Sequence, residues 1–184
     1  VRLSVDTRHT AVARAALAAG ADIVNDVSAA SDAGMLDVVA EHGADIVLMH
    51  MRGTPRTMQA APTYDDVVAV VTAYLLDRAA AAQTAGIAKE RIWLDPGIGF
   101  GKTLEHNLAL LRGLETLVQT GHPVLLGASR KSFLGALTGR EVAADRLAGS
   151  LACALRAMEA GVQGVRVHDV RETRELLEVY REIR

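Results

Sequence analysis

Six short apolar runs recur along the chain, and each of them ends on polar or charged residues. Stretches in which apolar residues follow helical spacing lie between the runs, so the chain repeats a unit of strand, polar end and helix. The runs are apolar on both faces, which is typical of buried strands in a parallel sheet. This pattern predicts an α/β protein with strands at residues 3–6, 22–26, 45–49, 92–95, 123–127 and 163–167.

The polar ends of the strands favour a barrel over a doubly wound sheet. In a (β/α)8 barrel all strand ends face one mouth, whereas a doubly wound sheet concentrates its site at one switch point. A full barrel typically needs about 250 residues, and this chain has 184. We therefore predict a single domain over residues 1–184 that holds six of the eight βα units of a TIM-type barrel. The other two are expected to precede Val1, because the chain has no initiating methionine and enters a strand almost at once.

Local signals agree with this division into units. Thr63–Asp66 and Asp169–Glu172 resemble capping boxes at the starts of helices. A glycine a few residues before a strand is placed to end the preceding helix in a left-handed conformation. Five glycines have this position, Gly20, Gly43, Gly86, Gly121 and Gly161.

The composition restricts the class of partner. Hydrophobic residues make up 50% of the chain, charged residues 23%, and the formal net charge is -2, which gives no reason to expect nucleic acid or an anionic membrane as a partner. No apolar run is long enough to cross a bilayer. The single cysteine, Cys153, lies in an apolar helical stretch and is expected to be a small buried side chain rather than a nucleophile. These features predict a cytoplasmic protein.

The segment Asp95–Thr103 is the richest in polar and glycine residues, and it matches no nucleotide-binding loop. A Walker A loop needs glycine at the position of Pro96, and a dinucleotide fingerprint needs its third glycine at the position of Lys102. The segment is therefore either a glycine turn in which Asp95 bonds nearby backbone N–H groups, or part of a binding site. Because Asp95 ends a buried strand, its carboxylate needs a partner or a ligand.

Asp6, Asn25 and Asp95 end three different predicted strands. Two carboxylates and a carboxamide at one mouth are suited to the hydrogen-bonding edge of a flat, nitrogen-rich heterocycle. Each of them could instead cap the helix that follows it. Three such residues on separate strands favour a site.

Cations follow the last two predicted strands. Lys131 and Arg166, with His168, lie where barrels often hold phosphate, although most surface cations are only solvated. His50 is expected to be a structural histidine, and Ser129 has no evident base beside it in the sequence. No histidine pair has the spacing of a helical zinc site. The remaining histidines are expected at the surface or at helix ends, namely His9, His42, His106 and His122.

Six segments together resemble the dihydropteroate synthases of the pterin-binding family. They occur in the family's order and cover nearly the whole chain, namely Ser4–Thr7, Val24–Val27, Leu48–Met51, Leu94–Lys102, Gly127–Ser132 and Arg166–Val170. The resemblance implies a pterin site that consists of Asp6, Asn25, Met49, Asp95, Phe100, Gly127, Lys131 and Arg166. It further implies that Arg166, His168 and Asn25 hold a diphosphate, and that Phe100 and Ser132 face p-aminobenzoate. Asp95, Lys131 and Arg166 would be the catalytic residues.

The resemblance also implies a reaction. The family, a sulfonamide target, is a transferase of folate biosynthesis that joins p-aminobenzoate to dihydropterin-CH2-diphosphate, and Mg²⁺ assists the leaving group. The metal ligand and two loops would lie upstream of Val1, so no metal ligand is expected in this chain, and the isolated chain is expected to be inactive. A homodimer through the late helices is implied as well.

Two other interpretations stay open. One is a methyltetrahydrofolate-dependent methyltransferase of the same family, which has no use for a diphosphate clamp, so Ser129–Lys131 argues against it. The other is an inactive pterin-binding fragment.

Overall fold

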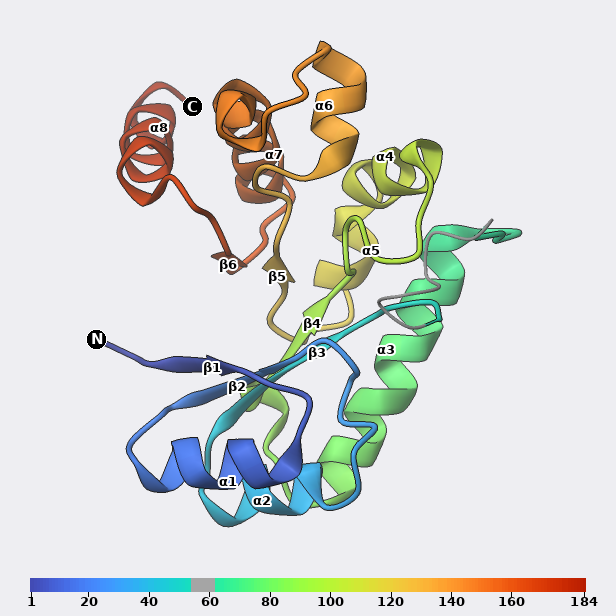
Figure 1. Ribbon diagram of the computed structural model, residues 1–184, viewed down its shortest axis with the longest axis vertical. Helices are drawn as coiled ribbons and strands as arrows, with labels where there is room; N and C mark the ends of the chain where they lie inside the picture. Colours follow the sequence, from blue (N-terminus) through green and yellow to red (C-terminus); the bar gives the residue numbers. More distant parts are fainter. Residues whose placement is uncertain (54–61) are drawn as a thin grey trace.

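In the part of the chain that the structure describes, six parallel strands form a curved wall, and each strand lies beside its neighbours in the sequence (Figure 1). The computed structural model describes residues 1–53 and 62–184. The strands are β1 (Ser4–Asp6), β2 (Ile23–Asp26), β3 (Asp45–Met49), β4 (Ile92–Asp95), β5 (Leu125–Leu126) and β6 (Gly164–Val165). The predicted strands are confirmed, although β5 and β6 are shorter than expected.

Two sheets are joined into this wall at one point. β1 to β4 pair in parallel, as do β5 and β6. A bridge between Leu94 and Val124 connects β4 to β5, and the Leu94 N–H donates to the Pro123 carbonyl oxygen at 2.9 Å. The result is an α/β fold of the TIM-barrel kind with six βα units, as predicted.

Helices cover the outer side of the wall (Figure 1). They are α1 (Thr10–Ala18), α2 (Met35–Glu41), α3 (Val67–Thr84), α4 (Leu104–Arg112), α5 (Leu114–Val118), α6 (Ser132–Thr138), α7 (Leu147–Glu159) and α8 (Val170–Ile183). Short 3-10 turns, η1 (Lys89–Arg91) and η2 (Ala143–Arg146), precede β4 and α7. In the part of the chain that the structure describes, no helix has the length and apolar character needed to cross a membrane.

The helix ends confirm the predicted glycines but not the predicted capping boxes. All five glycines have positive φ angles, between +59° and +100°. α3 begins after Asp66, whose carboxylate accepts from two backbone N–H groups, so a box starting at Thr63 is wrong. Asp169 precedes α8, but Arg130 binds its carboxylate in place of the helix N–H groups. The first box fails because the Asp66 carboxylate itself caps α3, and the second fails because Arg130 takes the Asp169 carboxylate.

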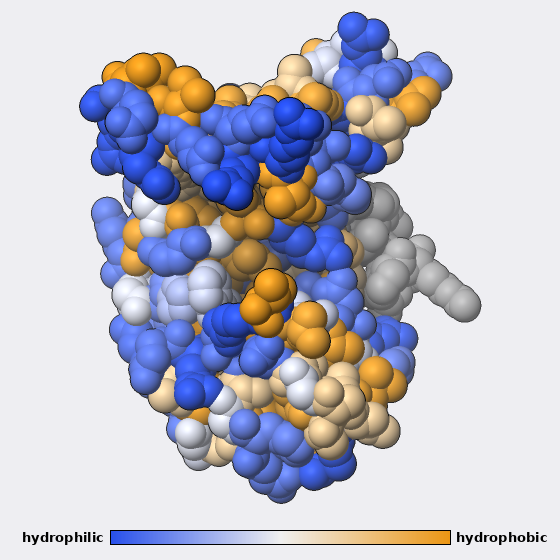
Figure 2. All heavy atoms as spheres, turned by 90° about the vertical axis from the view of Figure 1, so that its left-hand side faces the viewer, coloured by the Kyte–Doolittle hydropathy of each residue, from blue (hydrophilic) through white to orange (hydrophobic). Residues whose placement is uncertain are grey.

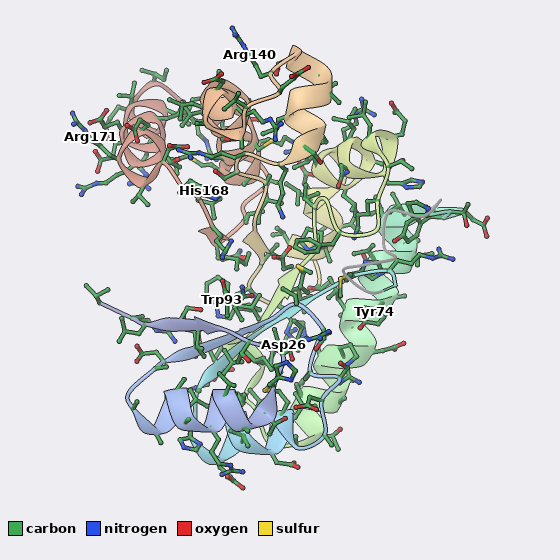
Figure 3. All side chains as sticks on the ribbon, in the orientation of Figure 1. Asp26, Tyr74, Trp93, Arg140, His168 and Arg171 are labelled. Atoms are coloured by element: carbon green, nitrogen blue, oxygen red, sulfur yellow. The ribbon has the colours of Figure 1, made fainter. Side chains whose placement is uncertain are left out.

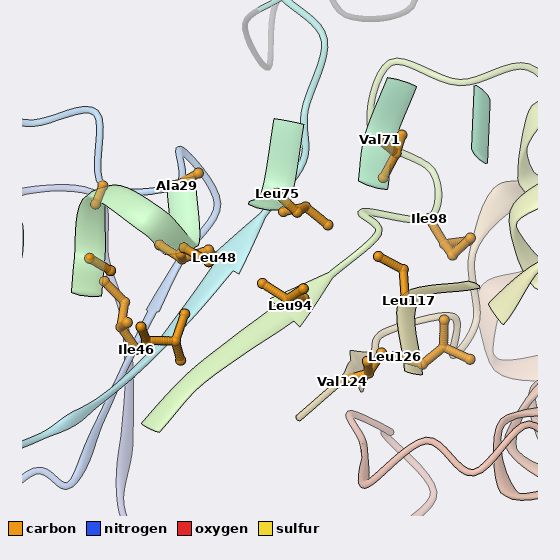
Figure 4. Close-up of a cluster of buried hydrophobic side chains, with 14 of the residues drawn as sticks. Ala29, Ile46, Leu48, Val71, Leu75, Leu94, Ile98, Leu117, Val124 and Leu126 are labelled. Carbon is orange, nitrogen blue, oxygen red and sulfur yellow. The ribbon is translucent and has the colours of Figure 1, made fainter. Parts of the chain in front are cut away.

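The core lies between the strands and the helices (Figure 4). Leu48 of β3 and Leu94 of β4 are fully buried, as are Leu75 and Val71 of α3. Burial of each such side chain stabilises the fold by about 1.5–3 kcal/mol. β3 and β4 are therefore held at the centre of the wall, where their carboxyl ends are fixed most firmly.

One side of the wall is open. Among the described residues, the outer edges of β1 and β6 have no strand partner. A hollow of about 450 Å³ lies between them, and its lining includes Val47, Trp93 and Leu125. Figure 2 faces this side and shows apolar atoms inside the hollow, and Figure 3 shows Trp93 between β4 and β6. A closed barrel has no such edges.

The remaining expectations concern Cys153 and two histidines, His50 and His122. Cys153 is buried as predicted, and burial raises the pKa of its thiol to about 11. His50 is buried and hydrogen-bonded, which agrees with a structural histidine. His122, which was expected at the surface or at a helix end, is buried three residues before β5.

Candidate active site

A pocket of about 360 Å³ opens at the carboxyl ends of the strands. Its lining comprises Asp6, Thr7, Arg8, His9, Asn25, Val27, Met49, Asp95, Phe100, Gly127, Lys131 and Arg166. Residues from the ends of all six strands therefore meet at one mouth. The eight residues expected to bind a pterin are all among them.

One wall of the pocket is a hydrogen-bonded chain of three side chains. The Asn25 Nδ2 group donates to Asp6 Oδ1 at 2.5 Å, and Arg166 donates to Asp6 Oδ2 at 2.6 Å. Asp6 and Arg166 are 160 residues apart in the sequence, so this contact spans the open side between β1 and β6. Asn25 Oδ1 is buried and has no hydrogen-bond partner among residues 1–53 and 62–184. Because a buried acceptor without a partner is costly, this oxygen is suited to accept from a ligand.

Asp95 supplies a buried carboxylate at the end of β4. Its Oδ1 atom accepts from the Gly97 N–H at 2.7 Å, so the expected bond to the glycine turn is present. Burial raises the pKa of Asp95 to about 6, against the opposing effects of this bond and of Lys131, Lys102 and Arg166. At neutral pH the group is therefore an anion that lines the pocket, as well as a residue that holds the turn.

The turn after Asp95 needs glycine for steric reasons. Gly97 has φ +68°, and a Cβ atom there would lie 1.9 Å from the His50 carbonyl oxygen. Gly101 has φ +62°, and a Cβ atom there would lie 2.6 Å from the Arg52 carbonyl oxygen. The turn consequently packs directly against the chain that leaves β3.

Lys131 and Phe100 form the opposite side of the pocket. The Lys131 ammonium lies 4.1 Å from the centre of the Phe100 ring, a distance at which a cation is attracted to an aromatic face. Burial lowers the pKa of Lys131, whereas nearby Asp95 acts in the opposite direction. The Lys131 ammonium thus lies against the Phe100 ring and close enough to Asp95 to interact with its charge.

Two predicted site residues are outside the pocket lining. Ser132 is the exposed first residue of α6. His168 lies after β6 (Figure 3), where its Nδ1 atom is 3.0 Å from the Ser129 hydroxyl oxygen. The expectation that Ser129 has no base beside it is therefore wrong, because the pairing of β5 with β6 brings His168 to it.

Arg130, the residue before Lys131, does not line the pocket and is paired with an acidic residue. Its guanidinium binds both carboxylate oxygens of Asp169. The Arg130 carbonyl oxygen also accepts from Arg146 at 2.9 Å. The ion pair joins the loop after β5 to the loop after β6, whereas Lys131 and Arg166 line the pocket and their charges act on Asp95.

Five residues at or beneath the site were not predicted from the sequence. Thr7, Arg8 and His9 line the pocket directly after β1, and Val27 does so directly after β2. Their position after a strand was a usable signal. Lys102 is only 3% exposed and does not line the pocket, but its charge acts on Asp95, which does.

Lys102 is surrounded by hydrogen-bond acceptors. Its ammonium lies 2.9 Å from the Phe100 carbonyl oxygen, 3.0 Å from that of Gly97 and 3.3 Å from that of His50. The His50 Nδ1 atom is a fourth neighbour at 3.0 Å. Burial lowers the pKa of Lys102 to about 7, and burial together with Lys102 lowers the pKa of His50 to about 3. His50 is therefore neutral and accepts from Lys102.

Residues 1–53 and 62–184 contain no evident cluster of metal ligands. Within these ranges no three or more histidine, cysteine or acidic side chains are grouped so that they could hold a metal ion. No residue of the pocket is therefore assigned to the Mg²⁺ that the resemblance implies.

Comparison with known proteins identifies the family. The family described as pterin binding enzyme matches residues 1–168. The chain belongs to the pterin-binding enzyme family. This membership agrees with the resemblance on which the site residues were selected.

Two similar proteins are dihydropteroate synthases. Dihydropteroate synthase of Neisseria meningitidis serogroup B is 50% identical over 98% of this chain and 65% of its own length. The Escherichia coli K12 enzyme is 48% identical over 97% of this chain and 63% of its own length. The chain thus spans slightly less than two thirds of the curated relatives it matches.

Solved structures agree closely in fold. Dihydropteroate synthase of Thermus thermophilus in complex with 6HMPPP superposes with a TM-score of 0.95 at 50% identity, over 99% of this chain and 72% of that one. The Xanthomonas albilineans enzyme in complex with 7,8-dihydropteroate has a TM-score of 0.93 at 48% identity, over 100% of this chain and 67% of that one.

Proposed function

We propose that this chain forms the pterin-binding part of a dihydropteroate synthase, which condenses dihydropterin-CH2-diphosphate with p-aminobenzoate to give dihydropteroate and diphosphate. One observation carries the proposal, namely that Asp6, Asn25, Asp95, Lys131 and Arg166 line a single pocket. Similar dihydropteroate synthases support it. The Xanthomonas albilineans enzyme has been crystallised with 7,8-dihydropteroate and, separately, with 4-aminobenzoic acid.

Asp95, Asn25 and Asp6 would bind the pterin ring. The Asp95 carboxylate, ionised at neutral pH, would accept from a ring N–H group and the exocyclic amine. The unpartnered Asn25 Oδ1 offers a further acceptor, and Asp6 borders the same edge. Met49 and Phe100 would cover the flat faces of the ring.

Lys131 would bind the carbonyl oxygen and a ring nitrogen of the pterin. Its ammonium already lies against Phe100, so few rotamers are lost when the ligand binds. Gly127 borders the same region, and even a Cβ atom there would lie 3.8 Å from Asp95 Oδ2. The missing side chain keeps this carboxylate oxygen open to the pocket.

Arg166 would exchange partners to hold the diphosphate. The Arg166 and Asp6 side chains are 57% and 54% exposed, and ion pairs of this kind contribute about 1 kcal/mol or less. A diphosphate is a stronger bidentate partner for a guanidinium. His168, oriented by Ser129, and the Asn25 amide would complete this end of the site.

The reaction would proceed by departure of the leaving group. The bond between the methylene carbon and the diphosphate oxygen breaks, and its electron pair leaves with the diphosphate. The resulting cation is shared with the pterin ring, the p-aminobenzoate amine attacks it, and the amine then loses a proton. Asp95, Lys131 and Arg166 would orient the pterin and stabilise the separating charges. Phe100 and Ser132 would face the incoming amine.

The experiment is a measurement of diphosphate release. It is run with dihydropterin-CH2-diphosphate, with and without p-aminobenzoate, on this chain and on a chimera that adds the part of the Neisseria meningitidis relative that the chain does not match. We expect release by the chimera only when p-aminobenzoate is present, and pterin binding without turnover by the chain alone. A methyltransferase or an inactive module would release none.

Two substitutions test the residue assignments in the chimera. Lys131→Ala and Arg166→Ala should each lower the release rate by at least about 100-fold, as removal of a group that stabilises developing charge typically does. Rates that stay within twofold of the unsubstituted chimera would contradict the assignments.

The proposal includes a cytoplasmic homodimer through the late helices. Val179 and Ile183 of α8 are 61% and 75% exposed, so this helix leaves apolar side chains uncovered. Light scattering should give twice the mass of one chain, and Val179→Glu should reduce it to that of one.

A further inference from the structure

We propose that Lys102 is a positioning residue of this pocket, whose ammonium group fastens the turn at residues 97–101 to the end of β3 and thereby determines where Asp95 and Phe100 stand. This inference rests on the proposed function for its ligand. Lys102 does not line the pocket, so it acts through its neighbours.

The contacts of Lys102 join two segments of the chain. The carbonyl oxygens of Gly97 and Phe100 belong to the turn, whereas the carbonyl oxygen and Nδ1 atom of His50 belong to the residue after β3. An ammonium group has three N–H donors. Four acceptors within 3.3 Å therefore use all of its hydrogen-bonding capacity and leave none for a ligand.

The two fastened segments carry the pocket residues. The Gly97 N–H holds the Asp95 carboxylate at 2.7 Å, and the His50 N–H donates to the Asp95 carbonyl oxygen at 3.0 Å. Phe100 presents its ring to Lys131. A shift of the turn that carries Gly97 and Phe100 would consequently move the Asp95 carboxylate and the Phe100 ring together.

Lys102 also acts on Asp95 through its charge. The charged or titratable groups that face Lys102 are Asp95, Lys131 and His50, and those that face Asp95 are Lys102, Lys131 and Arg166. The positive charge of Lys102 lowers the pKa of Asp95. Without it, Asp95 would take up a proton at a higher pH and would stop accepting from the pterin sooner as the pH falls.

Two substitutions of Lys102 separate the effect of its N–H donors from the effect of its positive charge. Lys102→Met keeps the apolar stem and removes both, whereas Lys102→Gln keeps two N–H donors without the charge. Lys89→Met is the control for the loss of a lysine outside the site, because Lys89 is exposed and its ammonium donates to the Thr120 carbonyl oxygen at 3.1 Å, away from the pocket lining.

Two readouts are needed. Carbon-13 NMR of the Asp95 carboxyl group, assigned with Asp95→Asn, follows its titration in the ligand-free chain. Calorimetry follows the binding of dihydropterin-CH2-diphosphate between about pH 5 and pH 8, the range around the Asp95 pKa of about 6. Urea unfolding at neutral pH establishes that each variant is folded under these conditions.

We expect both Lys102 variants to raise the pKa of Asp95 and to move the acid limit of binding to higher pH. At neutral pH Lys102→Met should weaken binding about tenfold or more, the loss of one charged hydrogen-bond network, and Lys102→Gln should recover part of that loss. Lys89→Met should match the unsubstituted chain in both readouts.

The proposal is overturned if Lys102→Met leaves the Asp95 titration unchanged and binds within twofold of the unsubstituted chain. It is also overturned if both Lys102 variants are unfolded, because Lys102 would then serve stability alone. If the unsubstituted chain does not bind the pterin, the proposed function fails, and the NMR titration still decides the role of Lys102.

Discussion

Replacement of Asp95 by asparagine should make the ligand-free protein more stable at neutral pH while it removes pterin binding. The pKa of Asp95 is raised from 3.8 to about 6 because the carboxylate is buried. One pKa unit corresponds to about 1.4 kcal/mol, so the ionised carboxylate costs the folded state about 3 kcal/mol above pH 6. Asparagine keeps the oxygen that accepts from the Gly97 N–H and carries no charge.

The effect of Asp95→Asn on the free energy of unfolding should depend on pH. Below pH 3.8 the carboxyl group is protonated in the folded and unfolded states alike, so it contributes no difference. Between pH 3.8 and about 6 only the unfolded state is ionised, so the stability due to Asp95 falls as the pH rises. The advantage of Asp95→Asn should therefore be near zero at about pH 4 and reach about 3 kcal/mol above pH 6.

The assay is urea unfolding of both proteins at several pH values from about 4 to 8, with calorimetric binding of dihydropterin-CH2-diphosphate at neutral pH. Asp26→Asn is a suitable control, because Asp26 ends β2, which is separated from β4 by β3. Both Asp26 oxygens accept, from the N–H and hydroxyl of Ser28 and the N–H of Ala30, so an amide there must turn one donor towards another. We expect that control to lose about 1–3 kcal/mol. An Asp95→Asn protein that is less stable at neutral pH, or whose gain does not vary with pH, would refute the reasoning.

Three further predictions follow from individual contacts. Gly97→Ala should cost about 3 kcal/mol or more in urea unfolding, because its Cβ atom would lie 1.9 Å from the His50 carbonyl oxygen, and a loss below about 1 kcal/mol would show that the turn can shift. Asn25→Asp should lower the melting temperature at neutral pH more than at about pH 4, since a second carboxylate would face Asp6 at a 2.5 Å contact, and equal losses at both pH values would contradict this. The Cys153 thiol, with a pKa of about 11, should react with a disulfide reagent at about pH 8 only after unfolding, and rapid labelling of the native protein would count against its burial.

Strand positions and the membership of the pocket could be predicted from the sequence because both are set by short-range patterns. Apolar runs bounded by polar residues mark buried parallel strands, and parallel strands with helical crossovers have their carboxyl ends on one side. Asp6, Asn25 and Asp95 could thus be grouped although 89 residues separate the first from the last. Helix starts were harder to predict, since Asp169 could bind either its own helix or Arg130.

What the sequence alone determined was the repeat of βα units and the set of residues at its mouth, because apolar periodicity and position after a strand are local properties. Only the tertiary structure decided which partners those residues have. The ion pair of Arg166 with Asp6, the contact of His168 with Ser129 and the bond of Lys102 to His50 all join segments that are distant in the sequence. A hydrogen bond requires that groups from distant segments be placed to within a fraction of an ångström, and no local pattern encodes that placement.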